Sequence, residues 1–186
     1  MNVSRWLRKI SCTVVMLGLA TLAIGAHAAN AATAPTQMTE EQHLSKMVRH
    51  ALVTVPWYGV FDNLEYSING SEVTLSGQVV QPITKSDAEN AVKRLEGVTR
   101  VVDNITVLPL SNFDDQIRRA EYRAIFRDPV LSRYSMGAIP AIHIIVNNGH
   151  VTLVGSVDRE MDANVARIRA LGVPGVFSVT NNLHVG

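Results

Sequence analysis

An internal repeat of 78 residues constrains the fold of this chain more than any other feature of its sequence. The stretch VTLSGQV at residues 73–79 returns as VTLVGSV at residues 151–157. Aligned at this offset without a gap, residues 73–107 and 151–185 share 11 identities in 35 positions, where ordinary residue frequencies give about two or three by chance. We therefore expect two copies of one small unit, and we expect packing between the copies to stabilise cores that are marginal alone.

The first copy is predicted to run in the order helix, strand, strand, helix, strand. Apolar residues at helical spacing predict helices over residues 40–53 and 84–95. Alternating apolar residues predict two strands that meet at the Asn-Gly pair of residues 69–70, a sequence typical of a tight hairpin turn. A last apolar segment, residues 98–107, supplies a third strand.

The second copy repeats this order. Its predicted helices cover residues 114–127 and 158–171, and its strands cover residues 141–146, 150–157 and 176–185. The fold class is therefore α+β, with two tandem α-β-β-α-β domains at residues 40–108 and 112–186. In each domain two helices are expected to cover one face of a three-stranded sheet.

The first 28 residues have the layout of a secretion signal. Three basic residues and no acid precede an apolar run from Cys12 to Ala26, and an Ala-His-Ala cleavage site ends at Ala28. An uncleaved membrane anchor is the alternative, but the run is short for a span, which needs about 20 residues. We expect export, with removal of residues 1–28 and of Cys12, the chain's single cysteine. Residues 29–39 are expected to form a flexible lead-in.

The repeated phrases resemble the BON domain family. Each copy has Val-Thr-Leu-x-Gly-x-Val, which begins at Val73 or Val151, followed by a helix and then Gly-Val-x-x-Val-x-x-Asn, which begins at Gly97 or Gly175. The resemblance covers about residues 40–186. It implies an α-β-β-α-β fold and no known catalytic activity. Two-copy members behind a signal peptide are periplasmic, and they are associated with osmotic stress, envelope integrity, phospholipid contact and chaperone-like action.

Composition and motifs exclude several functions. The 17 basic and 16 acidic residues nearly balance, which argues against a protein held to nucleic acid by bulk charge. The six histidines have no carboxylate at a regular ligand spacing, so no metal site or cofactor is expected. No nucleophile motif, phosphate loop or dinucleotide fingerprint occurs. We therefore expect a protein that is not an enzyme.

The opening helix of the second copy carries the first candidate binding surface. Arg119, Arg123 and Arg127 recur every four residues and share one face, with Tyr122 and Phe126 beside them. Arginines and aromatic rings along one helix suit an anionic phospholipid surface. The alternative is a solvated face whose arginines pair with nearby acids while the two rings enter the core; those acids are Asp115, Glu121 and Asp128.

Two further patterns bear on this helix. An apolar stripe on a different face is expected to be its buried side; it consists of Phe113, Ile117, Ala120 and Ala124. Residues 40–108 hold 6 basic and 9 acidic groups, whereas residues 112–186 hold 8 and 7. The second copy is therefore expected to be the half that faces a membrane.

A loop in the first copy carries the second candidate surface. Trp57, Tyr58 and Phe61 lie within six residues that begin at Pro56, and such rings can wedge into an interface. The alternative is that Phe61 and a neighbour plug the end of a small core. The leading hypothesis is thus an exported protein that contacts anionic phospholipid. Its alternative is a periplasmic chaperone or protein-interaction module that uses Trp57 and Tyr58 to bind envelope proteins or unfolded clients.

Overall fold

The computed structural model describes the chain from Ala34 to Gly186, and its side chains from Glu40; the predicted signal peptide lies outside these residues. The first domain consists of α1 (Ala34–Val53), β1 (Asn63–Asn69), β2 (Glu72–Val79), α2 (Pro82–Lys93) and β3 (Arg100–Val107). The second consists of α3 (Asn112–Phe126), the 3₁₀ turn η1 (Ser132–Ser135), β4 (Ile142–Asn147), β5 (His150–Val157), α4 (Glu160–Leu171) and β6 (Ser178–Val185). Apart from η1, each domain has the predicted order α-β-β-α-β.

The two sheets have the same topology. In each, the middle strand pairs antiparallel with the strand before it and parallel with the last strand, giving the orders β1-β2-β3 and β4-β5-β6. Val73 pairs with Ile68 and Val101. Val151 takes the equivalent place in the second sheet, so the structure confirms the predicted repeat.

The glycine inside each repeated phrase is required by a close backbone approach. Gly77 has φ +113°, and a Cβ placed there would lie 2.1 Å from the carbonyl oxygen of Asn63. Gly155 has φ +121°, and its Cβ would lie 2.0 Å from the carbonyl oxygen of Ala141. Only glycine fits at either position, which explains why this residue recurs in both copies.

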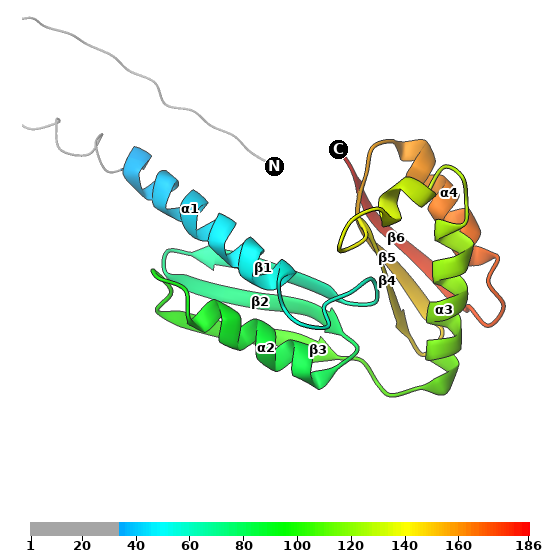
Figure 1. Cartoon of the computed structure of the whole chain (residues 1–186), viewed down its shortest axis with the longest axis horizontal. Helices are drawn as coiled ribbons and strands as arrows, with labels where there is room; N and C mark the ends of the chain where they lie inside the picture. Colours follow the sequence, from blue (N-terminus) through cyan, green and yellow to red (C-terminus); the bar gives the residue numbers. More distant parts are fainter. Residues whose placement is uncertain (1–33) are drawn as a thin grey trace, which may run out of the picture.

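Each domain has its own core between its helices and one face of its sheet. The first core includes Leu44, Val48, Leu75 and Val92, and the second includes Ile117, Ile144, Leu153 and Ala166. In Figure 1 the second sheet turns its uncovered face toward the first domain, while α3 and α4 lie on the far side. This arrangement leaves the outer surfaces of α3 and α4 open to solvent.

Helices α1 and α2 begin earlier than predicted, as does α3, which starts at Asn112 and not at residue 114. α1 starts at Ala34 and not at residue 40, so residues 34–39 are helical where a flexible lead-in was expected. α2 starts at Pro82 and not at residue 84. Both α1 and α2 have a proline in their first turn, where its missing N–H costs nothing and its fixed φ suits a helix. No helix among residues 34–186 is long and apolar enough to span a membrane.

The loop between α1 and β1 joins the two domains. The N–H of Ile144, on the edge strand β4, donates to the carbonyl oxygen of Val60 at 2.8 Å. Val60 and Phe61 pack against the core of the second domain although they belong to the first. The ring of Tyr58 stacks on the imidazole of His143 with 5.6 Å between ring centroids. The loop therefore covers part of the open edge of the second sheet.

Candidate functional site

The arginine face of α3 has the predicted geometry. Ser111 caps the helix, because its hydroxyl accepts the N–H of Asp114 at 3.1 Å. Arg119, Arg123 and Arg127 lie on successive turns and are all exposed. Arg127 is the C-cap residue, where a positive charge also interacts favourably with the helix dipole.

The three acids that were candidate partners for these arginines do not pair with them. Asp115 pairs with Arg118 at 2.6 Å. Asp128 pairs with Arg169 of α4 at 2.7 Å. Glu121 is fully buried. Within residues 40–186, no ion pair involves any of the three exposed arginines.

An exposed aromatic residue lies next to this face. Phe113 was predicted to be core, but 45 % of it is exposed, and its ring lies 6.2 Å from that of Phe177. A shallow cavity of about 330 Å³ is lined by Phe113, Pro174 and two of the arginines, Arg119 and Arg123. Phe113 lies in the first turn of the helix and has only polar neighbours in sequence. This pattern was the available sign that its ring is exposed, and the prediction of a core residue missed it.

The two aromatic residues predicted to lie beside the arginines differ in their exposure to solvent. Tyr122 is 40 % exposed, and its ring packs against those of Phe61 and Phe126. Phe126 is only 8 % exposed and belongs to the core of the second domain. Phe126 therefore does not reach the surface, as the alternative of buried rings anticipated.

The buried side of α3 is rotated from the predicted apolar stripe, because charged residues on it bind the backbone of the second sheet. Asp114 accepts the N–H groups of Asn148 and Gly149 at 2.9 and 2.8 Å and so holds the β4–β5 turn. Arg118 donates to the carbonyl oxygen of Val146 at 2.7 Å. The buried set is Asp114, Ile117, Arg118, Glu121, Ile125 and Phe126.

Glu121 differs from its charged neighbours on this side of the helix. Neither of its carboxyl oxygens has a hydrogen-bond partner among the described residues. Burial raises the pKa of Glu121 to about 8, because a charge is poorly solvated there. The carboxyl is therefore mostly protonated at neutral pH, and it adds no negative charge behind the arginine face.

The aromatic loop of the first domain points in two directions. Trp57 is 72 % exposed and has a left-handed backbone, with φ +68°. Tyr58 is half-buried against the first core, and burial raises its pKa to about 12. Asp62 closes the loop by accepting the N–H groups of Gly59 and Val80 at 3.0 and 2.7 Å. Of the two predicted contact residues, Trp57 is available at the surface and Tyr58 serves the domain contact.

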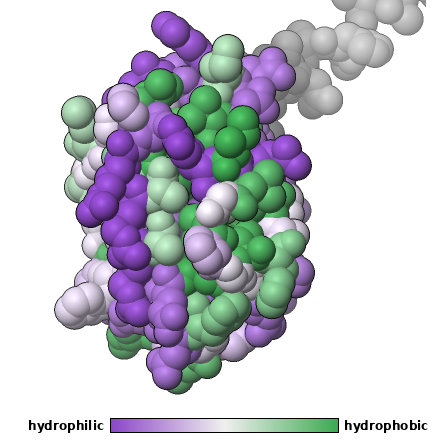
Figure 2. All heavy atoms as spheres, turned by 90° about the vertical axis from the view of Figure 1, so that its right-hand side faces the viewer, coloured by the Kyte–Doolittle hydropathy of each residue, from purple (hydrophilic) through white to green (hydrophobic). Residues whose placement is uncertain are grey.

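The helical side of the second domain combines apolar and cationic groups. Figure 2 shows this side, on which hydrophobic side chains gather between strips of hydrophilic ones. Its exposed large apolar residues include Phe113 and Tyr122 of α3 and Ile168 and Leu171 of α4. Across the part of the chain that the structure describes, no cluster of three or more histidines, cysteines or acids is arranged to hold a metal ion.

Comparisons with known proteins match the whole repeated region. The family model for the BON domain matches twice, at residues 41–109 and 114–186. No curated protein matches the sequence. Two solved structures of CdsD, a structural protein of the type III secretion system of Chlamydia trachomatis, match with 14 % identity and a TM-score of 0.28. The matches cover 77 % of this chain and 97 % and 92 % of those chains.

Proposed function

The chain belongs to the BON domain family, with two copies of the domain, and from this premise we propose that it is an exported, non-enzymatic envelope protein that binds anionic phospholipid through α3. The family is linked to phospholipid binding and to envelope proteins. The observation that carries the proposal is the exposed row of Arg119, Arg123 and Arg127, whose candidate acidic partners are buried or bound to other residues.

The chemistry of lipid contact follows from this row. A guanidinium group offers a planar fork of donors that matches a phosphate. Each basic residue near an anionic membrane surface contributes about 1 kcal/mol, so three give a weak and reversible attachment. Phe113 and Tyr122 add rings that favour the headgroup region, and Trp57 supplies a second exposed ring from the first domain.

The proposed location is the periplasm, after removal of the predicted signal peptide, residues 1–28. Without residues 1–28 the chain has no cysteine, so it can form no disulfide in an oxidising compartment. Attachment to a membrane would then depend on the surface of α3.

Liposome co-sedimentation of residues 29–186 tests the lipid proposal. Binding is expected with phosphatidylglycerol vesicles, to weaken as salt increases, and to be absent with phosphatidylcholine vesicles. Replacing Arg123 and Arg127 by glutamate should abolish it. The matched control makes the same charge change on α1, with Lys46→Glu and Arg49→Glu, and should retain most binding. Equal loss in both double variants would overturn the assignment to α3.

The second candidate function is a protein-interaction or chaperone module, and it is favoured by the exposure of Trp57 in a left-handed conformation. An exposed tryptophan suits a protein contact, because it brings a large apolar area at low entropic cost. Here the chain should suppress aggregation of a thermally unfolding client such as citrate synthase. Trp57→Ala should remove that effect, whereas the Arg123/Arg127 double variant should leave it unchanged.

A further inference from the structure

The two domains enclose a second candidate site, distinct from the surface of α3. Two adjoining cavities of about 570 and 590 Å³ lie between the domains. Both are lined by Asn63 and Glu65 of the first domain and by Val154 and His184 of the second. Cavities of this size at a domain boundary are typical places for a small ligand.

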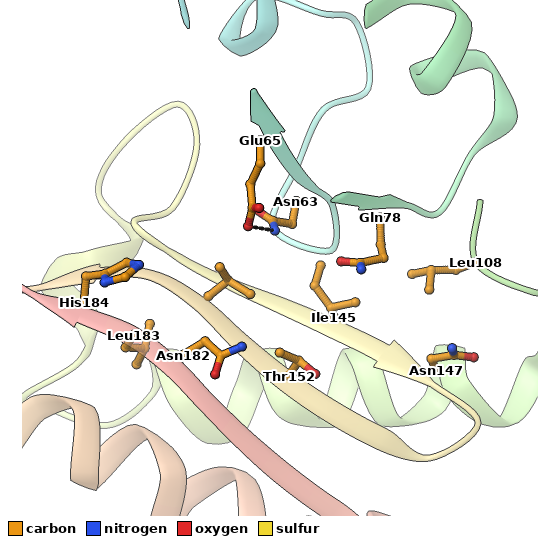
Figure 3. A pocket seen from close by; sticks show the side chains of 11 residues that line it. Asn63, Glu65, Gln78, Leu108, Ile145, Asn147, Thr152, Asn182, Leu183 and His184 are labelled. Carbon is orange, nitrogen blue, oxygen red and sulfur yellow. Dashed lines mark hydrogen bonds between the residues drawn. The ribbon is translucent and has the colours of Figure 1, made fainter. Parts of the chain in front are cut away.

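One wall of this interdomain cleft is the uncovered face of the second sheet. All three strands line the first cavity: Ile145 and Asn147 come from β4, Thr152 and Val154 from β5, and Asn182, Leu183 and His184 from β6. The opposite wall comes from the first domain. Figure 3 shows Asn63, Glu65 and Gln78 on that side, across from Ile145, Thr152 and Asn182.

The lining of the first cavity is polar but nearly uncharged. It contains four side-chain amides, Asn63, Gln78, Asn147 and Asn182, together with the hydroxyl of Thr152. Each amide both donates and accepts hydrogen bonds. Arg49 lines the second cavity, but no lysine or arginine lines the first, which therefore offers no such cation to a phosphate or carboxylate. Its chemistry favours a neutral ligand with many hydroxyl or amide groups.

One polar group is fixed in place and others are free to bind. The buried Asn63 donates from Nδ2 to Oε1 of Glu65 at 2.8 Å, which orients the carboxylate. Among the described residues, the side chains of Gln78, Thr152 and Asn182 take part in no hydrogen bond. A ligand would therefore meet an oriented acceptor and three unoccupied polar side chains without displacing internal bonds.

Apolar groups separate these polar ones. Ile145, Val154 and Leu108 line the first cavity, and the rings of Tyr58 and Tyr66 line the second. A sugar ring has the matching composition, with hydroxyl groups at its rim and C–H groups on its faces. An extended peptide that adds to a sheet runs along one edge strand, whereas this cleft crosses all three strands of the second sheet.

We propose that the interdomain cleft binds a neutral oligosaccharide, whose hydroxyl groups exchange hydrogen bonds with Gln78, Thr152, Asn182 and Glu65. The site does not depend on the lipid surface, because it shares no residue with the arginine face of α3. Failure of one proposal therefore leaves the other intact.

An NMR titration of ¹⁵N-labelled residues 29–186 tests this site, with the trimer of N-acetylglucosamine and with maltotriose as probes. At least one probe should cause saturable shifts in the side-chain amide signals of Gln78 and Asn182. The double variant Gln78→Ala and Asn182→Ala should bind about ten-fold more weakly, since it loses two hydrogen bonds.

The matched control is Asn104→Ala. Asn104 is the equivalent of Asn182 in the first domain, on an open sheet face outside both cavities, so its loss should not change binding. No saturable shift with either probe up to about 10 mM would overturn the proposal. Equal binding by the double variant would overturn it, and so would binding of an unfolded peptide in the cleft without sugar binding.

Discussion

Glu121 of α3 occupies the position that Val48 holds in α1. Aligning the two helices at an offset of 73 residues matches most of their buried and exposed positions, and both side chains are fully buried. The hydrogen bond from Val55 N–H to Leu52 O then corresponds to that from Asp128 N–H to Ile125 O. The repeated fold therefore has a valine in one copy where the other has an unpaired carboxyl.

Glu121→Val should stabilise the second domain, and more so at high pH. Because burial raises the pKa of Glu121 to about 8 from 4.5, the folded state binds a proton that the unfolded state releases between these values. That carboxyl therefore lowers stability as pH rises from 4.5 through 8. Urea unfolding should show a gain of about 1–3 kcal/mol at pH 8.5 and a smaller gain at pH 5. An equal gain in stability at both pH values would contradict the raised pKa of the buried Glu121 carboxyl.

Asp114→Ala should destabilise the second domain by about 2–4 kcal/mol, because it leaves the N–H groups of Asn148 and of the buried Gly149 without their charged acceptor. Chemical denaturation measures the loss. Glu41 is the matched control, since it takes the corresponding place in α1 but is exposed. Glu41→Ala should change stability by less than about 0.5 kcal/mol. A similar effect of both changes would argue against the role of Asp114 in the turn.

Phe61→Ala should weaken the second domain although Phe61 belongs to the first. Its ring packs against the second core, so truncation should cost about 1–3 kcal/mol there. Hydrogen exchange is the direct measurement: the amide of Ile144 should lose protection, while amides of β2 should keep theirs. Trp57→Ala, in the same loop but exposed, is the control. Unchanged protection at Ile144 would show that the loop does not hold β4.

Gly77→Ala should destabilise the first domain by more than about 2 kcal/mol, because the added methyl group would collide with the carbonyl oxygen of Asn63 and the backbone has a positive φ. Gly70 separates the two causes. It also has a positive φ, +61°, but no atom lies within 4 Å of its Cβ position. Thermal unfolding of Gly70→Ala should therefore show only the backbone cost, about 1 kcal/mol.

The order of helices and strands was predictable because it depends on local sequence patterns that both copies share. Gly77 and Gly155 recur because a side chain at either position would collide with a backbone oxygen. Val73 and Val151 recur because each lies on the middle strand of its sheet. The signal peptide lies outside the described residues, so that prediction remains untested by the structure.

The candidate site was only half predictable. Four-residue spacing was enough to place Arg119, Arg123 and Arg127 on one exposed face. It was not enough to find the buried side of α3, because Asp114 and Arg118 are buried where their side chains form hydrogen bonds with backbone groups about 30 residues away. Contacts such as those of Phe61 with the second domain, and the cleft between domains, depend on how the copies pack, which no local pattern states.

Because of the hydrogen bond from Ile144 N–H to Val60 O, the two copies depend on each other unequally. A fragment that began at α3 would lack the loop that shields β4, and its bare strand edge would be free to pair with other chains. The second copy should therefore be prone to self-association when it is produced alone. The first copy, produced alone, keeps this loop and loses only the contact that the loop makes with the second copy. Duplication has here produced two units that resemble each other but are not interchangeable.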